Sequence, residues 1–224
     1  IQNDTLEALM DEINKYPETD VLEYPIMERI GHPYKEQLLA FTPRNYNNCW
    51  EYWLNEQGYL HTYACNKIFR RCLFKNVYFP KGKTFEDVQT IPFLIGLIPT
   101  EGTFQQKVKI RVTNKGCYLY YWNNKGITAS AKYEDLLSLY IGQSMALIHT
   151  FKTIGNRDDI MQKYQLSINI YLTQILNVLM DLFEVSGKYE NCAPLIKYTK
   201  LINNKGLINS LKLKLLLIIG YKRL

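Results

Sequence analysis

The chain has 224 residues, 47% of them hydrophobic and 21% charged, and carries a net charge of +6. This composition can bury one sizeable core and is not that of a disordered chain. The five cysteines are scattered and form no C-x-x-C pair, which argues against a disulfide scaffold or a zinc module and favours a reducing, cytoplasmic location. The longest aliphatic run is only Leu215–Ile219, which argues against a membrane-spanning segment.

The charge is unevenly distributed along the chain. No acidic residue follows Glu190, so the preceding residues sum to −1 and the positive charge belongs to the end of the chain. Seven basic residues lie beyond that point: Lys197, Lys200, Lys205, Lys212, Lys214, Lys222 and Arg223.

Helix and strand patterns alternate from the start of the chain. A helix is predicted over residues 4–16, where an Asp4-x-x-Glu7 capping pattern precedes apolar residues at helical spacing. Residues 20–29 are rich in strand formers but contain Pro25, which predicts a strand with an irregular or edge segment.

Two short helices are predicted next, over residues 49–57 and 61–76. The second would place Ala64, Ile68 and Phe69 on one face.

A further helix is predicted over residues 84–98, with its cap at Thr84. The strand-forming runs 107–113 and 117–122 flank Asn114-Lys115-Gly116, and this arrangement predicts a β-hairpin.

From Tyr133 onward every pattern is helical. The sequence therefore predicts an α/β protein, with a mixed sheet and flanking helices over residues 1–132 and an all-helical region over residues 133–224. The clearest helical stripe is formed by Met161, Tyr164, Ile168, Tyr171, Leu172, Ile175, Leu179 and Leu182.

Glu86 and Asp87 open the helix predicted after Thr84. A capping box explains them without any catalytic role, with Thr84 as the cap and Asp87 as the third helical residue. A carboxylate at a helix N-terminus is also held in its ionised form, which is what a general base requires. The structural and the catalytic interpretations are compatible.

Other candidate groups give weaker signals. His32, His61 and His149 lack metal-ligand spacing; His149 is expected to be structural, and His61 could line a pocket. The aromatic run Tyr118–Trp122 alternates across a strand, so one or two rings could stack on a sugar or a base, although core packing is the more common role. No phosphate-binding loop, G-x-S-x-G or zinc-finger motif is present.

Several separated motifs agree in order and spacing with one known family. They are Asn66-Lys67, Phe79-Pro80, Gly82, Phe85-Glu86-Asp87 and, after the aromatic strand, Gly126-Ile127-Thr128. Over residues 1–135 the chain resembles the second half of bacterial family 2 glycosyltransferases, which have a GT-A fold and use nucleotide-activated sugars. The resemblance implies the remainder of a GT-A-type mixed sheet.

The resemblance also implies roles for individual residues. In that family the Asp of the Glu-Asp pair is the proposed catalytic base of inverting transfer, which implies this role for Asp87. The implied partners are a nucleotide-sugar donor and a saccharide or lipid-linked acceptor in cell-envelope polysaccharide synthesis. The candidate acceptor-binding residues are Glu86, His61, Asn66, Lys67 and Trp122.

Family members also carry a nucleotide-binding strand–loop unit and a D-x-D motif that holds a divalent metal, Mn²⁺ or Mg²⁺, on the diphosphate. The first residues of this chain resemble the helix after D-x-D. We therefore expect residues 1–132 to be the acceptor-side half of the catalytic domain, incomplete and inactive alone, with the metal ligands outside this chain.

Residues 207–224 combine leucines and isoleucines with lysines. This pattern favours a helix on an anionic membrane surface, so the alternative to catalysis is a non-catalytic membrane-surface or interaction module, peripheral at the inner face of the membrane. A last helix that packs its apolar side on the preceding helices would explain the same residues. Nucleic-acid binding is not expected, because the basic residues are not on the aromatic strand.

Overall fold

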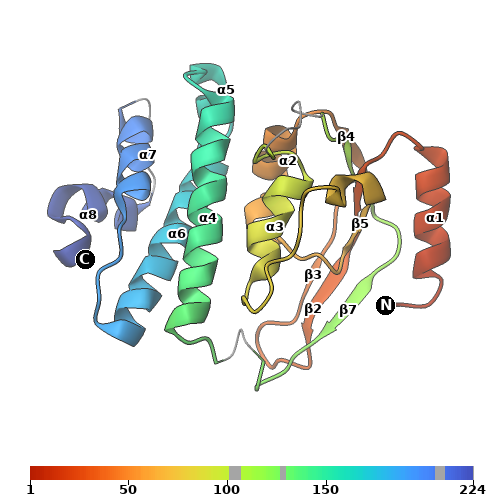
Figure 1. The fold of residues 1–224 in the computed structure, drawn as a ribbon, viewed down its shortest axis with the longest axis horizontal. Helices are drawn as coiled ribbons and strands as arrows, with labels where there is room; N and C mark the ends of the chain where they lie inside the picture. Colours follow the sequence, from red (N-terminus) through yellow and green to blue (C-terminus); the bar gives the residue numbers. More distant parts are fainter. Residues whose placement is uncertain (101–106, 127–129, 205–209, 224) are drawn as a thin grey trace. The chain divides into compact units, whose positions relative to one another are not determined.

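The computed structural model describes residues 1–100, 107–126, 130–204 and 210–223 (Figure 1). It shows a mixed α/β protein with two mixed sheets and a helical C-terminal region, which confirms the predicted class. The chain forms two compact units. The first comprises Ile1–Cys49, Tyr63–Tyr78 and Thr90–Ser130, and the second Trp50–Thr62, Phe79–Gln89 and Ala131–Leu224.

The first unit contains two sheets. One has the strand order β4-β6-β1-β5. The other has the order β3-β2-β7 (Figure 1). The strands are β1 (Val21–Glu23), β2 (Ile26–Ile30), β3 (Gln37–Leu39), β4 (Arg44–Tyr46), β5 (Lys67–Phe69), β6 (Ile110–Val112) and β7 (Tyr118–Tyr121).

Two neighbouring segments cross from one sheet to the other. The first crosses between β1 and β2 at Tyr24-Pro25, which confirms the predicted interruption of the strand at Pro25. The second crosses between β6 and β7. Because β1 pairs in parallel with β6, and β2 in parallel with β7, the two crossings run side by side. The predicted hairpin is therefore wrong, since β6 and β7 belong to different sheets.

The start of the first helix explains why β7 does not fold back on β6. Gly116 has φ +66°, and a Cβ at this position would lie 2.7 Å from Thr5 Cγ2. The Cys117 amide donates to Thr5 Oγ1 at 3.1 Å, and the Gln2 amide donates to the Cys117 carbonyl at 3.0 Å. These contacts hold a bend that sends the chain to the second sheet.

The helix predicted over residues 61–76 is also wrong. Lys67–Phe69 form β5, which pairs antiparallel with β1, and a 3-10 turn, η2 (Arg71–Phe74), follows. The register places Ile68 opposite the buried Leu22. Pairing with β1 satisfies the backbone groups of this segment, and this long-range contact outweighs its local helical pattern.

The predicted N-terminal helix is confirmed as α1 (Thr5–Lys15). Its buried Leu9 packs with Leu22 and Tyr24 in the core of the unit. The predicted capping box is wrong, because Asp4 has φ +59° and its side chain makes no capping hydrogen bond. The first turn is held instead by the Thr5 hydroxyl, which accepts from the Cys117 amide.

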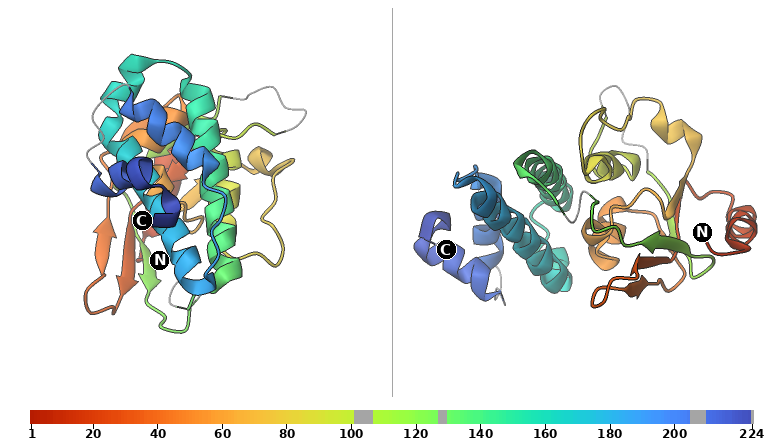
Figure 2. Two further views of the ribbon diagram at one scale, coloured as in Figure 1. Left: turned by 90° about the vertical axis from the view of Figure 1, so that its left-hand side faces the viewer. Right: turned by 90° about the horizontal axis from the view of Figure 1, so that it is seen from below.

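The second unit is mainly helical, as predicted from Tyr133 onward. Figure 2 shows α7 and α8 beside α6, with α4 packed on the same helix. The helices are α4 (Tyr133–Ile154), α5 (Asp158–Lys163), α6 (Gln165–Ser186), α7 (Ala193–Asn203) and α8 (Leu211–Ile219), followed by the 3-10 turn η4 (Tyr221–Arg223). All eight residues of the predicted helical stripe are buried.

Two segments from the first half of the chain belong to this helical unit, so the contacts divide the chain differently from the predicted boundary after residue 132. One includes most of α2 (Cys49–Asn55), the helix predicted over residues 49–57, and the 3-10 turn η1 (Gly58–Leu60). The Ser167 hydroxyl on α6 donates to the Leu54 carbonyl at 2.6 Å, and the Tyr59 ring stacks on Tyr171 at 4.3 Å.

Among the described residues, α6 is long and apolar enough to cross a membrane by length and composition alone. Core helices share this property, and 56% of its most apolar window is buried inside the structure.

Candidate functional site

The Glu86-Asp87 pair lies in the first turn of α3 (Glu86–Leu94). The predicted helix is confirmed, but the predicted capping box is wrong, because the helix begins two residues after Thr84. Phe85, immediately before the helix, has φ +52°, which is a strained conformation for a bulky residue. The Asp87 Oδ1 atom accepts from the Val88 amide at 2.9 Å.

Helix α4 holds this turn through side chains of the same unit. The Thr84 hydroxyl donates to Asp135 Oδ1 at 2.6 Å, and the Ser138 hydroxyl donates to the Thr84 carbonyl at 2.6 Å. The Gln89 amide donates to Ser138 Oγ, also at 2.6 Å. Because the Thr84 hydroxyl and the Lys132 amide both donate to Asp135, they lower the pKa of its carboxyl group.

Close packing reinforces these hydrogen bonds. A Cβ at Gly142 would lie 3.0 Å from the Gln89 side chain and 3.1 Å from the Val88 side chain, so α4 approaches the start of α3 as closely as a glycine permits. The turn that carries Glu86 and Asp87 is therefore fixed, while both side chains are only partly buried.

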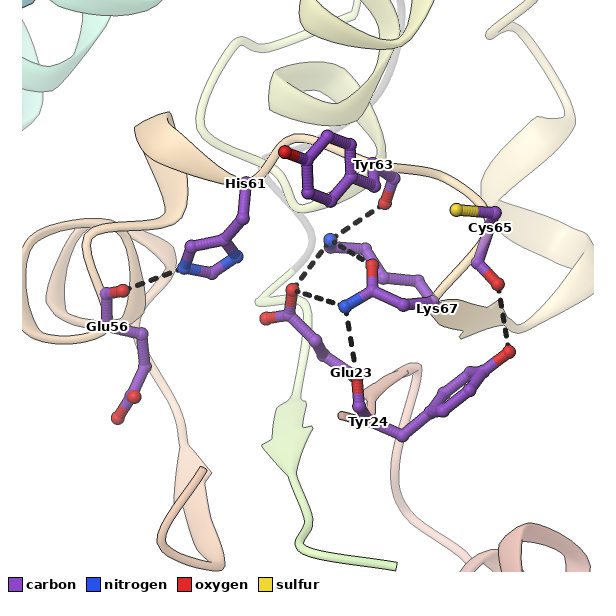
Figure 3. A network of polar contacts seen from close by, with 8 residues as sticks. Glu23, Tyr24, Glu56, His61, Tyr63, Cys65 and Lys67 are labelled. Atoms are coloured by element: carbon purple, nitrogen blue, oxygen red, sulfur yellow. Dashed lines mark hydrogen bonds and ion pairs between the residues drawn. The ribbon is translucent and has the colours of Figure 1, made fainter. Parts of the chain in front are cut away.

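Lys67 belongs to a buried network in the first unit (Figure 3). Asn66 is part of the same network. Lys67 Nζ lies 2.7 Å from Glu23 Oε1, and both side chains are 0% exposed. The ammonium also donates to the Tyr63 carbonyl at 2.8 Å and to Asn66 Oδ1 at 3.1 Å. These are three acceptors for three N–H bonds, so Lys67 would have to give up one of them to bind a sugar.

The amide of Asn66 completes this network. It donates to the Tyr24 carbonyl at 2.9 Å, and the Tyr24 hydroxyl donates to the Cys65 carbonyl at 2.8 Å (Figure 3). Burial raises the pKa of Tyr24 to about 12, so it remains a donor at neutral pH. The network ties β1 to the start of β5.

His61 lies in the second unit and is 3% exposed. Its Nε2 atom lies 2.7 Å from the Glu56 carbonyl (Figure 3). Since a carbonyl only accepts hydrogen bonds, Nε2 carries the proton in this arrangement.

Trp122 directly follows β7 in the first unit, and its amide donates to the Ile30 carbonyl at 3.0 Å. The His32 ring contacts Trp122 edge to face, with ring centroids 4.6 Å apart. Next to this pair, β2 contains a bulge between Met27 and Ile30, where Arg29 has φ +54°. Bulges and strained residues of this kind are common beside functional sites.

Glu28 lies within this bulge and is buried, and the sequence analysis did not predict it as a site residue. Glu28 accepts from Gln37 Nε2 at 2.7 Å, and burial together with the Glu28 carboxylate raises the pKa of Tyr63. Tyr120 stacks on Tyr63 with ring centroids 6.4 Å apart. The alternation of Tyr118–Trp122 was the available signal for Tyr120, whereas no local pattern marks Glu28.

The predicted site residues therefore have separate surroundings. Asn66 and Lys67 share one network, Trp122 contacts His32, and Glu86 and Asp87 lie in one turn. Their predicted binding and catalytic roles stay predictions. Ile127 and Thr128, which contribute to the resemblance, lie outside the described residues.

No group of three or more His, Cys, Asp or Glu side chains in the described part of the chain could hold a metal ion. The divalent metal implied by the resemblance therefore has no ligand set among these residues. A comparison with models of protein families finds no match, and neither does a comparison with curated proteins.

Proposed function

We propose that the chain is part of a glycosyltransferase of GT-A type, in which Asp87 is the general base that activates the acceptor. The observation that carries the proposal is the fixed turn at the start of α3. A strained Phe85, three hydrogen bonds of 2.6 Å and the close approach at Gly142 hold the turn that carries this partly exposed carboxylate. Catalytic groups need such fixed positions.

The chemistry follows from the position of Asp87. A carboxylate in the first turn of a helix is stabilised in its ionised form. It accepts the proton of an acceptor hydroxyl while that oxygen attacks the anomeric carbon of the donor sugar. The bond from this carbon to the nucleoside diphosphate breaks, and the diphosphate leaves with the electron pair. A saccharide or a lipid-linked saccharide supplies the hydroxyl.

The test compares Asp87→Asn with Glu86→Gln in the full-length natural protein. Each protein is incubated with UDP- and GDP-sugars, Mn²⁺ or Mg²⁺ and a panel of saccharide acceptors, and nucleotide release and product mass are measured. Asp87→Asn should lower turnover by about 10²- to 10⁴-fold, because an amide cannot take a proton. Glu86→Gln should cost less, because neighbouring helical residues point about 100° apart.

The melting temperature separates catalysis from folding in this test. Asn keeps an oxygen that can accept from the Val88 amide, so Asp87→Asn should melt close to the parent protein. Near-normal turnover of this variant would place the base elsewhere. No transfer from any donor by the parent protein would reject the proposed enzyme class.

A further inference from the structure

Helix α8 has two different apolar sides. Its inner side packs on α6 and α7 through Leu213 and Leu216, which are 0% and 2% exposed. This part of the tail agrees with a packed last helix. The outer side carries four large aliphatic residues that are at least 37% exposed: Leu211 (70%), Leu215 (37%), Ile218 (77%) and Ile219 (37%).

The exposed residues form a single stripe. At about 100° per residue, Leu211, Leu215, Ile218 and Ile219 fall within an arc of about 100° on the helix. Lys212 and Lys214 flank this arc on its two sides, and both are exposed. An aliphatic stripe between lysines is the arrangement of a helix that lies at a lipid–water interface, where the ammonium groups reach the headgroups.

Contacts with α6 hold the stripe in place. Just before α8, Ser210 Oγ accepts from the Thr173 hydroxyl at 3.1 Å. Within α8, Lys212 Nζ donates to Asn177 Oδ1 at 2.7 Å. After α8, the Tyr221 hydroxyl donates to the Leu179 carbonyl at 2.5 Å. The outer face is therefore displayed by a docked helix and does not depend on unfolding of the tail.

Aromatic residues lie next to the end of α8. Tyr221 contacts Tyr189 edge to face, and Tyr189 stacks on Phe183 with ring centroids 4.4 Å apart. Together with Met180, Glu184 and Lys222 these rings line a pocket of about 260 Å³. Tyrosine and lysine at the edge of an apolar surface are typical of the membrane interface.

The charges favour an anionic partner. Lys222 and Arg223 follow α8 and are exposed, and no acidic residue follows Glu190 in the sequence. The acidic residues of α6 are Asp181 and Glu184, and Lys212 interacts with Asp181. Lys214, Lys222 and Arg223 are all exposed, and they outnumber Glu184 and Glu190, the remaining acidic groups near the end of α8.

We propose that the outer face of α8 docks on the surface of an anionic lipid bilayer, with Leu211, Leu215, Ile218 and Ile219 in contact with the acyl region and Lys214 and Lys222 at the headgroups. This attachment does not depend on the proposed transferase activity. It refines the membrane-surface hypothesis for residues 207–224 to one face of one helix.

The experiment is vesicle co-sedimentation of the whole chain, with phosphatidylglycerol–phosphatidylcholine vesicles compared with phosphatidylcholine alone. Binding should need the anionic lipid and fall as the salt rises from about 0.05 to 0.5 M. Ile218→Ser and Leu211→Ser should each weaken binding about tenfold, and Lys214→Gln about fivefold. Leu166→Ser is the matched control, because Leu166 is 65% exposed on α6 and lies outside the stripe.

Folding does not confound these variants, since their side chains are solvent-exposed, and circular dichroism checks it. Equal binding by Ile218→Ser, Leu166→Ser and the parent chain would overturn the proposal, as would no binding at all. A parent chain that is dimeric in sedimentation velocity and that Ile218→Ser converts to a monomer would also overturn it, because a second copy would then cover the stripe.

Discussion

At the scale of single residues, the ion pair between Glu23 and Lys67 is notable because both charged side chains are fully buried. Two charged side chains with no exposed area are tolerated only when their partners are complete. Lys67 has three acceptors, and Asn66 bridges the pair to the Tyr24 carbonyl. Asn66-Lys67 was singled out as a binding motif, but its geometry favours a structural role.

Lys67→Met should therefore destabilise the protein strongly, because the Glu23 carboxylate stays buried while it loses the Lys67 ammonium. We expect the free energy of unfolding to fall by about 3–5 kcal/mol in urea denaturation. Arg70→Met is the control, because the Arg70 side chain, which pairs with Asp20, is 45% exposed. Losing this ion pair should lower the free energy of unfolding by only about 0–1 kcal/mol. If Lys67→Met is as stable as the parent protein but binds the acceptor more weakly, Lys67 has the predicted acceptor-binding role and not a structural one.

The Asp135 carboxyl group makes the turn before α3 sensitive to acid. Its pKa is lowered in the folded state, so it contributes stability that is present above its ordinary value of 3.8 and lost as the pH falls through the lowered value. Thr84→Val removes the hydrogen bond that lowers the pKa of Asp135 most. This pKa should therefore rise, while the Lys132 amide still keeps it below 3.8. An NMR titration of the side-chain carboxyl measures this, and an unchanged pKa would mean that the Thr84 hydrogen bond is absent in solution.

At the scale of elements, local patterns predicted helices well and strand partners poorly. The stripe from Met161 to Leu182 is buried as expected, because a helix satisfies its own backbone and needs only one apolar face. The strand β5 was mistaken for a helix because its partner, β1, lies more than forty residues away in the chain. The candidate site divides in the same way: the helix that carries Glu86 and Asp87 was predictable from local sequence although its cap was not, whereas Glu28 depends on the bulge in β2.

The crossing between β6 and β7 depends on the missing side chain of Gly116. Gly116→Ala should destabilise the protein by more than the roughly 1–2 kcal/mol that left-handed backbone alone costs, because its Cβ would also meet Thr5 Cγ2. Gly31→Ala is the matched control, with φ +87° and open space around it. Thermal melts should rank the two variants in that order.

A second substitution tests the cause of the Gly116→Ala effect. Thr5→Ser removes Cγ2 but keeps the hydroxyl that accepts from the Cys117 amide, so it should recover part of the lost stability. If Gly116→Ala costs no more than Gly31→Ala, or if Thr5→Ser adds to the loss, the contact with α1 does not shape the crossing.

At the scale of the whole molecule, neither compact unit is a continuous stretch of the sequence. The helical unit takes in Trp50–Thr62 and Phe79–Gln89 from the first half of the sequence. Trp53 and Tyr59 are 1% and 3% exposed there, and both contact Tyr171 on α6. A boundary drawn where the sequence pattern changes to helices alone would remove these residues from their core.

A fragment of residues 133–224 should therefore fail to fold as a stable unit, although its sequence is wholly helical in pattern. Losing Trp53 and Tyr59 leaves Tyr171 uncovered, and a large aromatic side chain removed from a core costs about 3–5 kcal/mol, against a total stability of about 5–15 kcal/mol for a typical domain. The Ser167 hydroxyl also loses the Leu54 carbonyl. We expect helical circular dichroism without a cooperative melt, together with dye binding to exposed apolar surface.

Tyr59→Phe in the whole chain is the control, because it removes only the hydroxyl bonds to Ser167, at a cost of about 1 kcal/mol, and should still melt cooperatively. A fragment that melts cooperatively at the temperature of the whole chain would show that the helices form a domain without the two upstream segments.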